Sequence, residues 1–481
     1  MKSVRKIDIP STKKKLDYLG FFAIYPVIFL VVLGVWASSN QSGSVFVLCL
    51  WILALSPLVF SRYSIFEPIT IYLALFLIPF TIKPLLNQYI SSTGDGFLFF
   101  LSGNENLYEI GFPFATLFVL IHIYLVHTIY FLSTRRKSSL LLQISKSRWK
   151  SGQAHFEDFS IWKKTTFLGF LIYIPALIYF IIFIQGMNFE VYAANRNNLL
   201  LGQGFAWLLA NLGTPLAICY FYIFILKIVS KKSGILYISL AIFCVITTQF
   251  VAPGRGNIIN IIIASIIIYW WKVSSVSFSK LSGLAIAFVL FSLTSLHIRE
   301  GVSQFNYDSV IFFISQDIGM FDYFTIYVGK MFSSDLGLSY GAQLLRNFYV
   351  FLPRAFFPQK PLFYSTLEIQ DANQIVPVES SHVSITPFVE WLFNFGILGI
   401  VFGSVVLAVS LVFIYRGLTA RGRDIGMISY ALIFPTFVVG YLKGGFSLAF
   451  QFFWLSPAWL IVLIYLCIKH IFFMKSLKKN I

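Results

Sequence analysis

The stretch QFVAPGRGNIINIIIASIIIYWW, residues 249–271, places a single arginine, Arg255, between two long apolar segments. Gly254 and Gly256 flank the arginine, and the segment after it is long enough for a helix that crosses much of a bilayer. A guanidinium is costly in hydrocarbon, so Arg255 is expected at the end of a span, where it meets water, lipid headgroups or a ligand. The rest of the chain decides how this arginine is interpreted.

Apolar residues dominate the whole chain. Of its 481 residues, 58% are hydrophobic and 11% are charged, which is far from the composition of soluble proteins. This composition predicts an all-α polytopic membrane protein. The four cysteines lie inside apolar segments, so they are interpreted as small buried hydrophobic residues and not as a disulfide or metal framework.

Apolar runs of about 17 to 25 residues predict about twelve transmembrane helices. The runs start near residues 18, 44, 66, 111, 165, 205, 234, 256, 281, 392, 426 and 448. The predicted order is a tail (1–17), nine helices with short loops (18–297), one large external loop (298–391), three helices (392–469) and a second tail (470–481).

The basic residues predict how the helices are oriented. Most of the 36 lysines and arginines fall on the same side as the amino terminus, which the positive-inside rule assigns to the cytoplasm together with both termini. Anionic lipid headgroups account for the net charge of +17 without a nucleic-acid partner. The basic residues expected outside are Arg196, Arg255, Arg299, Lys330, Arg346, Arg354, Lys360 and Lys443.

The external loop 298–391 is the only long connection, and a loop of this size usually carries function. We expect it to form a folded cap on the outer face. Its segment 309–332, SVIFFISQDIGMFDYFTIYVGKMF, is expected to lie along the bilayer surface as an interfacial helix. Three prolines in RNFYVFLPRAFFPQKP (346–361) exclude one continuous helix there.

Arg255 is interpreted as an anion ligand. A helix that begins at about Asn257 directs free backbone N–H groups and the positive end of its dipole toward the same point as the guanidinium. An arginine pairs with phosphate oxygens through two parallel hydrogen bonds, which lysine cannot reproduce. The alternative is an arginine that extends to lipid headgroups.

Two further external arginines favour the same interpretation. Arg299 lies at the predicted outer end of the ninth span, and Arg196 lies in the external loop 188–204, which has no lysine. Arg299 and Glu300 can instead neutralise each other, and Arg196 can be an ordinary solvated loop residue.

The order of several motifs resembles a known family. An external ANRNN (194–198) is followed by GRG (254–256), then by LPRAFFPQKP (352–361) in a long external loop, and then by SSHVSITPFVEWLFNFGILGIVFG (380–403) entering the next span. This order is similar to that of the bacterial Wzy-type O-antigen polymerases, which are related to O-antigen ligases.

The resemblance implies a glycosyltransferase of the bacterial inner membrane. It would polymerise undecaprenyl-diphosphate-linked oligosaccharide repeat units at the outer face of that membrane, in lipopolysaccharide or other polysaccharide biosynthesis, with a chain-length regulator membrane protein as a partner. Arg255, Arg299 and Arg196 would stabilise the departing lipid diphosphate. No cofactor or metal is expected, because the sequence contains no D-x-D pair and no cluster with metal-ligand spacing.

Two residues compete for the role of base toward the acceptor hydroxyl. His382 lies well inside the external loop, matches the histidine that O-antigen ligases carry at this position, and belongs to a residue type with an ordinary pKa near 6.5. Glu390, at the mouth of the next helix, is the alternative base or a residue that orients the acceptor sugar. His382 can also be a loop histidine bonded to backbone.

The external loop supplies further candidate substrate ligands, namely Arg346, Arg354, Lys360 and Tyr340. Two other functions remain open. An O-antigen ligase would use the same arginines but a different acceptor. A flippase or transporter of lipid-linked oligosaccharides would bury several charges along its spans, whereas the apparent exception here, Lys83, lies near an outer end.

Overall fold

A computed structural model of the chain describes its helical segments. The described residues are 67–93, 105–134, 159–183, 208–251, 255–273, 319–333, 338–345, 347, 386–419 and 424–479, with 47, 48, 50 and 52. Nearly all of them are helical, and these ranges contain no strand. Six helices among them are long and apolar enough to cross a membrane. The protein is therefore an α-helical, membrane-embedded protein.

The chain forms two compact units, which we describe separately. The first comprises residues 1–141, 315–343 and 364–412, and the second comprises 142–314, 344–363 and 413–481. The helices of the first unit are α3 (Pro68–Thr93), α4 (Glu105–Thr134), α14 (Met320–Ser333), α17 (Pro387–Phe395) and most of α18 (Leu398–Thr419). Those of the second are α6 (Phe159–Phe183), α9 (Gly213–Val229), α10 (Ile235–Val251), α11 (Arg255–Lys272), α19 (Asp424–Trp454) and α20 (Ala458–Lys479); the short α15 (Ala342–Leu345) crosses the boundary.

Most of the predicted spans that fall on described residues correspond to a helix. The runs predicted from about 66, 111, 165, 205, 234, 256 and 426 match α3, α4, α6, α9, α10, α11 and α19. The run predicted from 392 is instead divided between α17 and α18, because the chain turns at Gly396, whose φ is 59°. The spans predicted from 18 and 281 lie outside the described residues, as does nearly all of the one predicted from 44.

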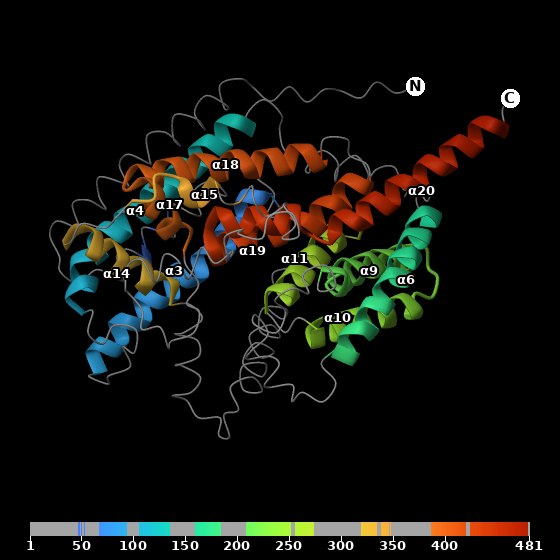
Figure 1. The fold of residues 1–481 in the computed structure, drawn as a ribbon, viewed down its shortest axis with the longest axis horizontal. Helices are drawn as coiled ribbons and strands as arrows, with labels where there is room; N and C mark the ends of the chain where they lie inside the picture. The colour runs from blue at the N-terminus through green and yellow to red at the C-terminus, as the bar shows by residue number, and fades with distance from the viewer. Residues whose placement is uncertain are drawn as a thin grey trace, which may run out of the picture. The chain divides into compact units, whose positions relative to one another are not determined.

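Helix α14 belongs to the interior of the first unit. It packs against α3 and α4 (Figure 1), and its residues from Phe321 to Gly329 are all buried. Gly111 of α4 faces the backbone of α14, and Gly329 faces the backbone of α4, so neither position has room for a side chain. The prediction of a helix lying on the bilayer surface is therefore wrong for Met320–Ser333, because both neighbouring helices cover it.

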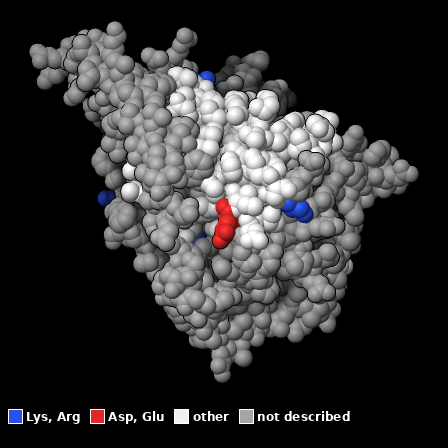
Figure 2. Space-filling view, turned by 90° about the vertical axis from the view of Figure 1, so that its left-hand side faces the viewer, with Lys and Arg blue, Asp and Glu red and all other residues white. Residues whose placement is uncertain are grey.

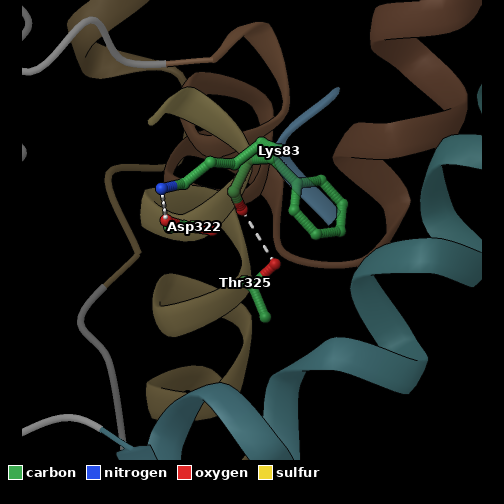
Figure 3. Close-up of polar contacts among 4 residues, drawn as sticks. Lys83, Asp322 and Thr325 are labelled. Atoms are coloured by element: carbon green, nitrogen blue, oxygen red, sulfur yellow. Dashed lines mark hydrogen bonds and ion pairs between the residues drawn. The ribbon is translucent and has the colours of Figure 1, made fainter. Parts of the chain in front are cut away.

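A buried ion pair joins α14 to α3. The Nζ atom of Lys83 lies 3.0 Å from Oδ2 of Asp322, and both side chains are buried (Figure 3). The Thr325 hydroxyl, one turn along α14, donates to the Phe321 carbonyl at 2.8 Å. Removing one partner of a buried pair typically costs about 3–5 kcal/mol, because the other charge stays buried. Lys83 therefore fixes α14 and does not carry an isolated charge into the membrane.

Histidine side chains are also buried in the first unit. His122 of α4 lies 2.8 Å from the Tyr72 hydroxyl of α3 and 2.8 Å from the Ser404 hydroxyl of α18. His127 is buried one to two turns further along α4. These polar contacts tie three long helices together, which is how buried polar groups are usually satisfied within a bilayer.

The second unit carries lysines over aromatic rings at one end. The Nζ atoms of Lys227, Lys164 and Lys272 lie 5.0 Å, 4.2 Å and 4.0 Å from the ring centroids of Phe159, Phe472 and Trp271, and Lys469 lies over Tyr465 at 5.6 Å. We call these four lysines the basic rim. They come from the start of α6 and from the ends of α9, α11 and α20, so these four helix ends lie on the same side of the second unit.

The described surface suits a lipid environment. Large apolar side chains are exposed along α6 and α10, including Leu171, Ile182, Ile235 and Ile246. On the face drawn in Figure 2, charged side chains are isolated within a described surface that is otherwise uncharged. Such surfaces are expected where helices meet acyl chains and not water.

Helix α19 reverses its direction. Gly444 and Gly445 have non-helical backbone angles, with φ 72° and ψ −161° at Gly445. The residues on either side pack against each other: a Cβ on Gly440 would stand 3.1 Å from Cα of Ala449, and the rings of Phe437 and Phe453 are 6.3 Å apart. Residues nine apart in a continuous helix would be separated by about 13 Å along its axis.

Residues 424–443 and 446–454 of α19 are therefore two arms of a helical hairpin, and we call 443–447 the α19 reversal. The second arm leads through Ser456 and Pro457 into α20. The reversal lies between the starts of the two apolar runs predicted near 426 and 448, and a separate membrane crossing by each run stays a prediction.

Candidate functional site

The first turn of α11 provides backbone donors. The helix begins at Arg255, so the N–H groups of Gly256 and its neighbours have no acceptor within the helix. Gly256 has no side chain to cover them, and the helix dipole adds partial positive charge at this end. The sequence predicted a helix start at about Asn257, and the helix in fact begins two residues earlier. The side chain of Arg255 lies outside the described part of the structure.

A lysine from α19 reaches the same turn. The Nζ atom of Lys443 lies 3.5 Å from the point where a Cβ on Gly256 would stand, and Val439 lies beside it. Lys443 is the last helical residue before the α19 reversal, and it is partly exposed. The Lys443 ammonium and the amino terminus of α11 thus bring positive charge to one place, which favours a bound anion.

The α19 reversal adds polar backbone next to this turn. The φ and ψ angles of Gly445 fall in a region that essentially only glycine adopts, so this position depends on the absence of a side chain. Backbone without helical hydrogen bonds is tolerated at membrane depth only where protein surrounds it or where it lines a cavity. Half-helix ends of this kind form the substrate and ion sites of several membrane transporters.

Two buried asparagines flank the reversal and the first turns of α11. Asn347 is 2% exposed, and its Nδ2 donates to the Ser447 hydroxyl at 2.8 Å. Asn260 of α11 is 6% exposed and lies four residues after Gly256, on the same helix face. We call Gly256, Asn260, Asn347, Lys443 and Ser447 the α11–α19 site; all of them belong to the second unit.

Two predicted site residues lie together in the first unit. Glu390 is in the first turn of α17 and is 1% exposed, and its carbonyl accepts a hydrogen bond from Asn394 at 2.8 Å. Asn394 also donates to Gln343 at 2.7 Å, and the Ser339 amide donates to the Phe393 carbonyl. These bonds hold the turn that contains Tyr340 against the end of α17.

Tyr340 and Glu390 differ sharply in accessibility. Tyr340 is 80% exposed and has a positive φ of 48°, which is uncommon for a tyrosine. An exposed, fixed ring of this kind can stack against a sugar face. Glu390 is covered by protein and lies where a negative charge stabilises the start of a helix, so its position also fits a structural role.

The other predicted site residues are not described by the structure. They are Arg196, Arg299, Arg346, Arg354, Lys360 and His382. Arg346 does immediately precede Asn347, so the chain at this point is held close to the α19 reversal. The structure thus brings the backbone of Arg255 and the residue after Arg346, Asn347, to helices that pack together, α11 and α19.

The two buried tyrosines of α14 do not provide an alternative base. Burial raises the pKa of Tyr323 and of Tyr327, so both phenols are neutral at physiological pH. Among the described side chains, no group of three or more His, Cys, Asp and Glu residues is placed to hold a metal ion. Metal independence stays a prediction from the sequence, because much of the external loop lies outside the described ranges.

Sequence reasoning did not identify most of the α11–α19 site. Lys443 was recognised only as an external basic residue, and Asn260, Asn347 and Ser447 were not singled out. The available signal was YLKGGFS (441–447), in which a lysine and two glycines interrupt an apolar run. Two adjacent glycines next to a charge at a span boundary are typical of a chain reversal that lines a site.

The comparisons with known proteins add no relative. No protein-family model, no curated protein and no solved structure matches the chain. The α11–α19 site is therefore interpreted from its own geometry and from the sequence.

Proposed function

We propose that the protein is a membrane glycosyltransferase that polymerises undecaprenyl-diphosphate-linked oligosaccharide repeat units. The observation that carries this proposal is the approach of the Lys443 ammonium to the first turn of α11, at Gly256 and beside Arg255. A lipid diphosphate is an anion presented at the depth of helix ends, and this turn offers an ammonium, backbone donors and an arginine to hold it.

The depth of the site supports a lipid-linked ligand. Helix α11 has 18 residues, so Gly256 lies about 25 Å from Lys272 of the basic rim, close to the thickness of the hydrocarbon core. By the positive-inside rule the basic rim would face the cytoplasm, and the α11–α19 site would then lie at the outer face. Lipid-linked repeat units would be polymerised at that face of the bacterial inner membrane.

The reaction requires charge stabilisation and one proton transfer. The acceptor hydroxyl forms a glycosidic bond to the anomeric carbon of the donor sugar while the bond from that carbon to the diphosphate oxygen breaks. The hydroxyl proton goes to a base, for which His382 and Glu390 are the candidates, and the lipid diphosphate leaves as an anion. Arg255 and Lys443 would stabilise the charge that builds on it, with Arg299 and Arg196 as further expected ligands.

The test is a reaction with purified protein and an undecaprenyl-diphosphate-linked repeat unit. We expect a ladder of product lengths, formed at an unchanged rate when EDTA is present, because the site neutralises the diphosphate with cationic side chains. Loss of the ladder with EDTA and its recovery with magnesium would contradict the metal-free mechanism. Absence of any ladder, with or without magnesium, would contradict the polymerase function.

Two alternative functions are separated by the same reaction. An O-antigen ligase would use the α11–α19 site but would transfer the glycan once, to a lipid A core, and would give one product instead of a ladder. A flippase is favoured by the buried polar groups of the first unit, Lys83 with Asp322 and His122 with His127. It would move the lipid-linked unit across vesicles without forming any new bond.

A further inference from the structure

The α11–α19 site contains buried hydrogen-bond acceptors as well as positive charge. The Asn347 side chain is held by its hydrogen bond to Ser447, and its Oδ1 accepts no hydrogen bond from the described part of the chain. Oδ1 of Asn260 is also buried and has no partner within the described ranges. A buried acceptor without a donor is destabilising, so each oxygen favours a ligand that donates.

Each acceptor is linked to an element that carries or faces the Lys443 ammonium. Ser447, which orients Asn347, follows Lys443 by four residues across the reversal, a path that spans at most about 14 Å. Asn260 lies one turn beyond Gly256, whose position the Lys443 ammonium approaches. Helices α11 and α19 pack against each other, so Asn260 in α11 and Asn347, bonded to the α19 reversal, lie on neighbouring elements.

A simple phosphate would bind the ammonium and the amino terminus of the helix but would leave the asparagine acceptors unpaired. A sugar attached to the diphosphate brings hydroxyl groups, which donate hydrogen bonds directly beside the anion. Carboxamide oxygens accept such bonds, and a carboxamide fixed by its own second hydrogen bond loses little freedom on binding. The Asn347–Ser447 contact provides that fixation.

We propose that Asn347 and Asn260 form a sugar subsite that accepts hydrogen bonds from the first saccharide of the lipid diphosphate. This proposal rests on the proposed function, because it assigns the diphosphate of the same ligand to Gly256 and Lys443. It makes the α19 reversal a determinant of specificity: the cationic part binds any lipid diphosphate, and the asparagines distinguish a glycosylated lipid from a bare one.

The test compares two kinds of probe with the full-length protein in nanodiscs of neutral lipid. One probe is undecaprenyl diphosphate, and the others carry a single N-acetylglucosamine, N-acetylgalactosamine, galactose or glucose. Wild-type protein is expected to bind at least one glycosylated probe about tenfold more tightly than the bare one, as the gain of a hydrogen bond to a buried group predicts. Asn347→Ala is expected to remove most of this preference and to change the affinity for the bare probe less than twofold.

Other variants keep the test decisive if Asn347→Ala does not fold. Asn260→Leu is expected to reduce the preference in the same way. Ser447→Ala is expected to reduce it partly, because this variant keeps the Asn347 acceptor but removes the hydrogen bond that orients it. Tyr173→Phe is the matched control: it removes another buried hydrogen bond of the second unit, 2.6 Å from Tyr173 to Thr247, and is expected to leave the preference unchanged.

Several outcomes would overturn the subsite. Equal binding of bare and glycosylated probes by the wild type would exclude it. If Asn347→Ala lowers the affinity for the bare and the glycosylated probes equally, the role of Asn347 is structural. If phosphatidylglycerol added to the nanodiscs abolishes the preference, the site holds a general lipid headgroup. Failure of the wild type to bind any of the probes would instead contradict the proposed function.

Discussion

Replacing Arg255 with lysine is expected to lower the polymerisation rate almost as far as replacing it with alanine. Removing one preorganised donor at a developing negative charge typically lowers a rate by about a hundredfold or more. Lysine keeps the charge but loses the planar pair of donors that grips two phosphate oxygens. The first turn of α11 already has an ammonium close by, from Lys443, so a second ammonium does not replace the missing fork.

The measurement is the distribution of polymer lengths in membranes that contain equal amounts of each variant. Arg416→Lys is the control, because Arg416 lies in the last turn of α18 and is expected on the cytoplasmic side. An arginine that only meets lipid headgroups contributes no more than about 1 kcal/mol, as exposed ion pairs do. Wild-type ladders from both Arg255→Lys and Arg255→Ala would show that Arg255 is an anchor to headgroups and would exclude it from the site.

Replacing His382 with alanine is expected to lower the polymerisation rate by about a hundredfold or more while the affinity for the lipid-linked donor stays unchanged. A general base contributes about this much, and its proposed partner is the acceptor hydroxyl and not the diphosphate. We favour His382 over Glu390 because Glu390 is 1% exposed and lies in the first turn of α17, where an acidic side chain suits a structural role at the helix start.

Glu390→Gln separates the two candidates, because glutamine keeps the shape of the side chain and loses the charge. We expect this variant to lower the yield of folded protein, with the remaining protein active. Rate and donor affinity are measured for both variants in the same preparation. A folded Glu390→Gln protein without activity, beside an active His382→Ala protein, would assign the base to Glu390.

The helical, membrane-embedded architecture could be predicted because it depends on composition and on the length of apolar segments. A bilayer requires every spanning segment to satisfy its own backbone, so an apolar run of sufficient length has few alternatives to a helix. Helices α4, α6 and α9 follow this rule directly. The sequence also predicted a boundary between two apolar segments within α19, since the apolar run is interrupted at Lys443–Gly444.

The position of α14 could not be predicted in the same way. Its sequence has an apolar face and two charged residues, Asp322 and Lys330, which suits an interfacial helix as well as a covered one. What decides between them is the fit of Gly111 and Gly329 against opposing backbones, together with the pairing of Asp322 with Lys83. Both features depend on contacts between residues more than two hundred positions apart, and such contacts cannot be predicted from the local sequence.

The candidate site was predicted only where charge revealed it. An arginine between two glycines at a helix start is visible in the sequence, and Arg255 does occupy the first residue of α11. Asn260 and Asn347 are ordinary polar residues until the fold buries them, Asn260 in α11 and Asn347 against the α19 reversal. Burial and the absence of a donor, which make them informative, are properties of the packed structure.

The most direct measurement is a cryo-electron microscopy structure of the full-length protein with bound undecaprenyl diphosphate. We expect the diphosphate to lie within hydrogen-bonding distance of the Gly256 amide and of the Lys443 ammonium, with the Arg255 guanidinium paired to its oxygens. A diphosphate bound elsewhere, such as at the basic rim near Lys272, with the α11–α19 site free of it, would contradict the central claim.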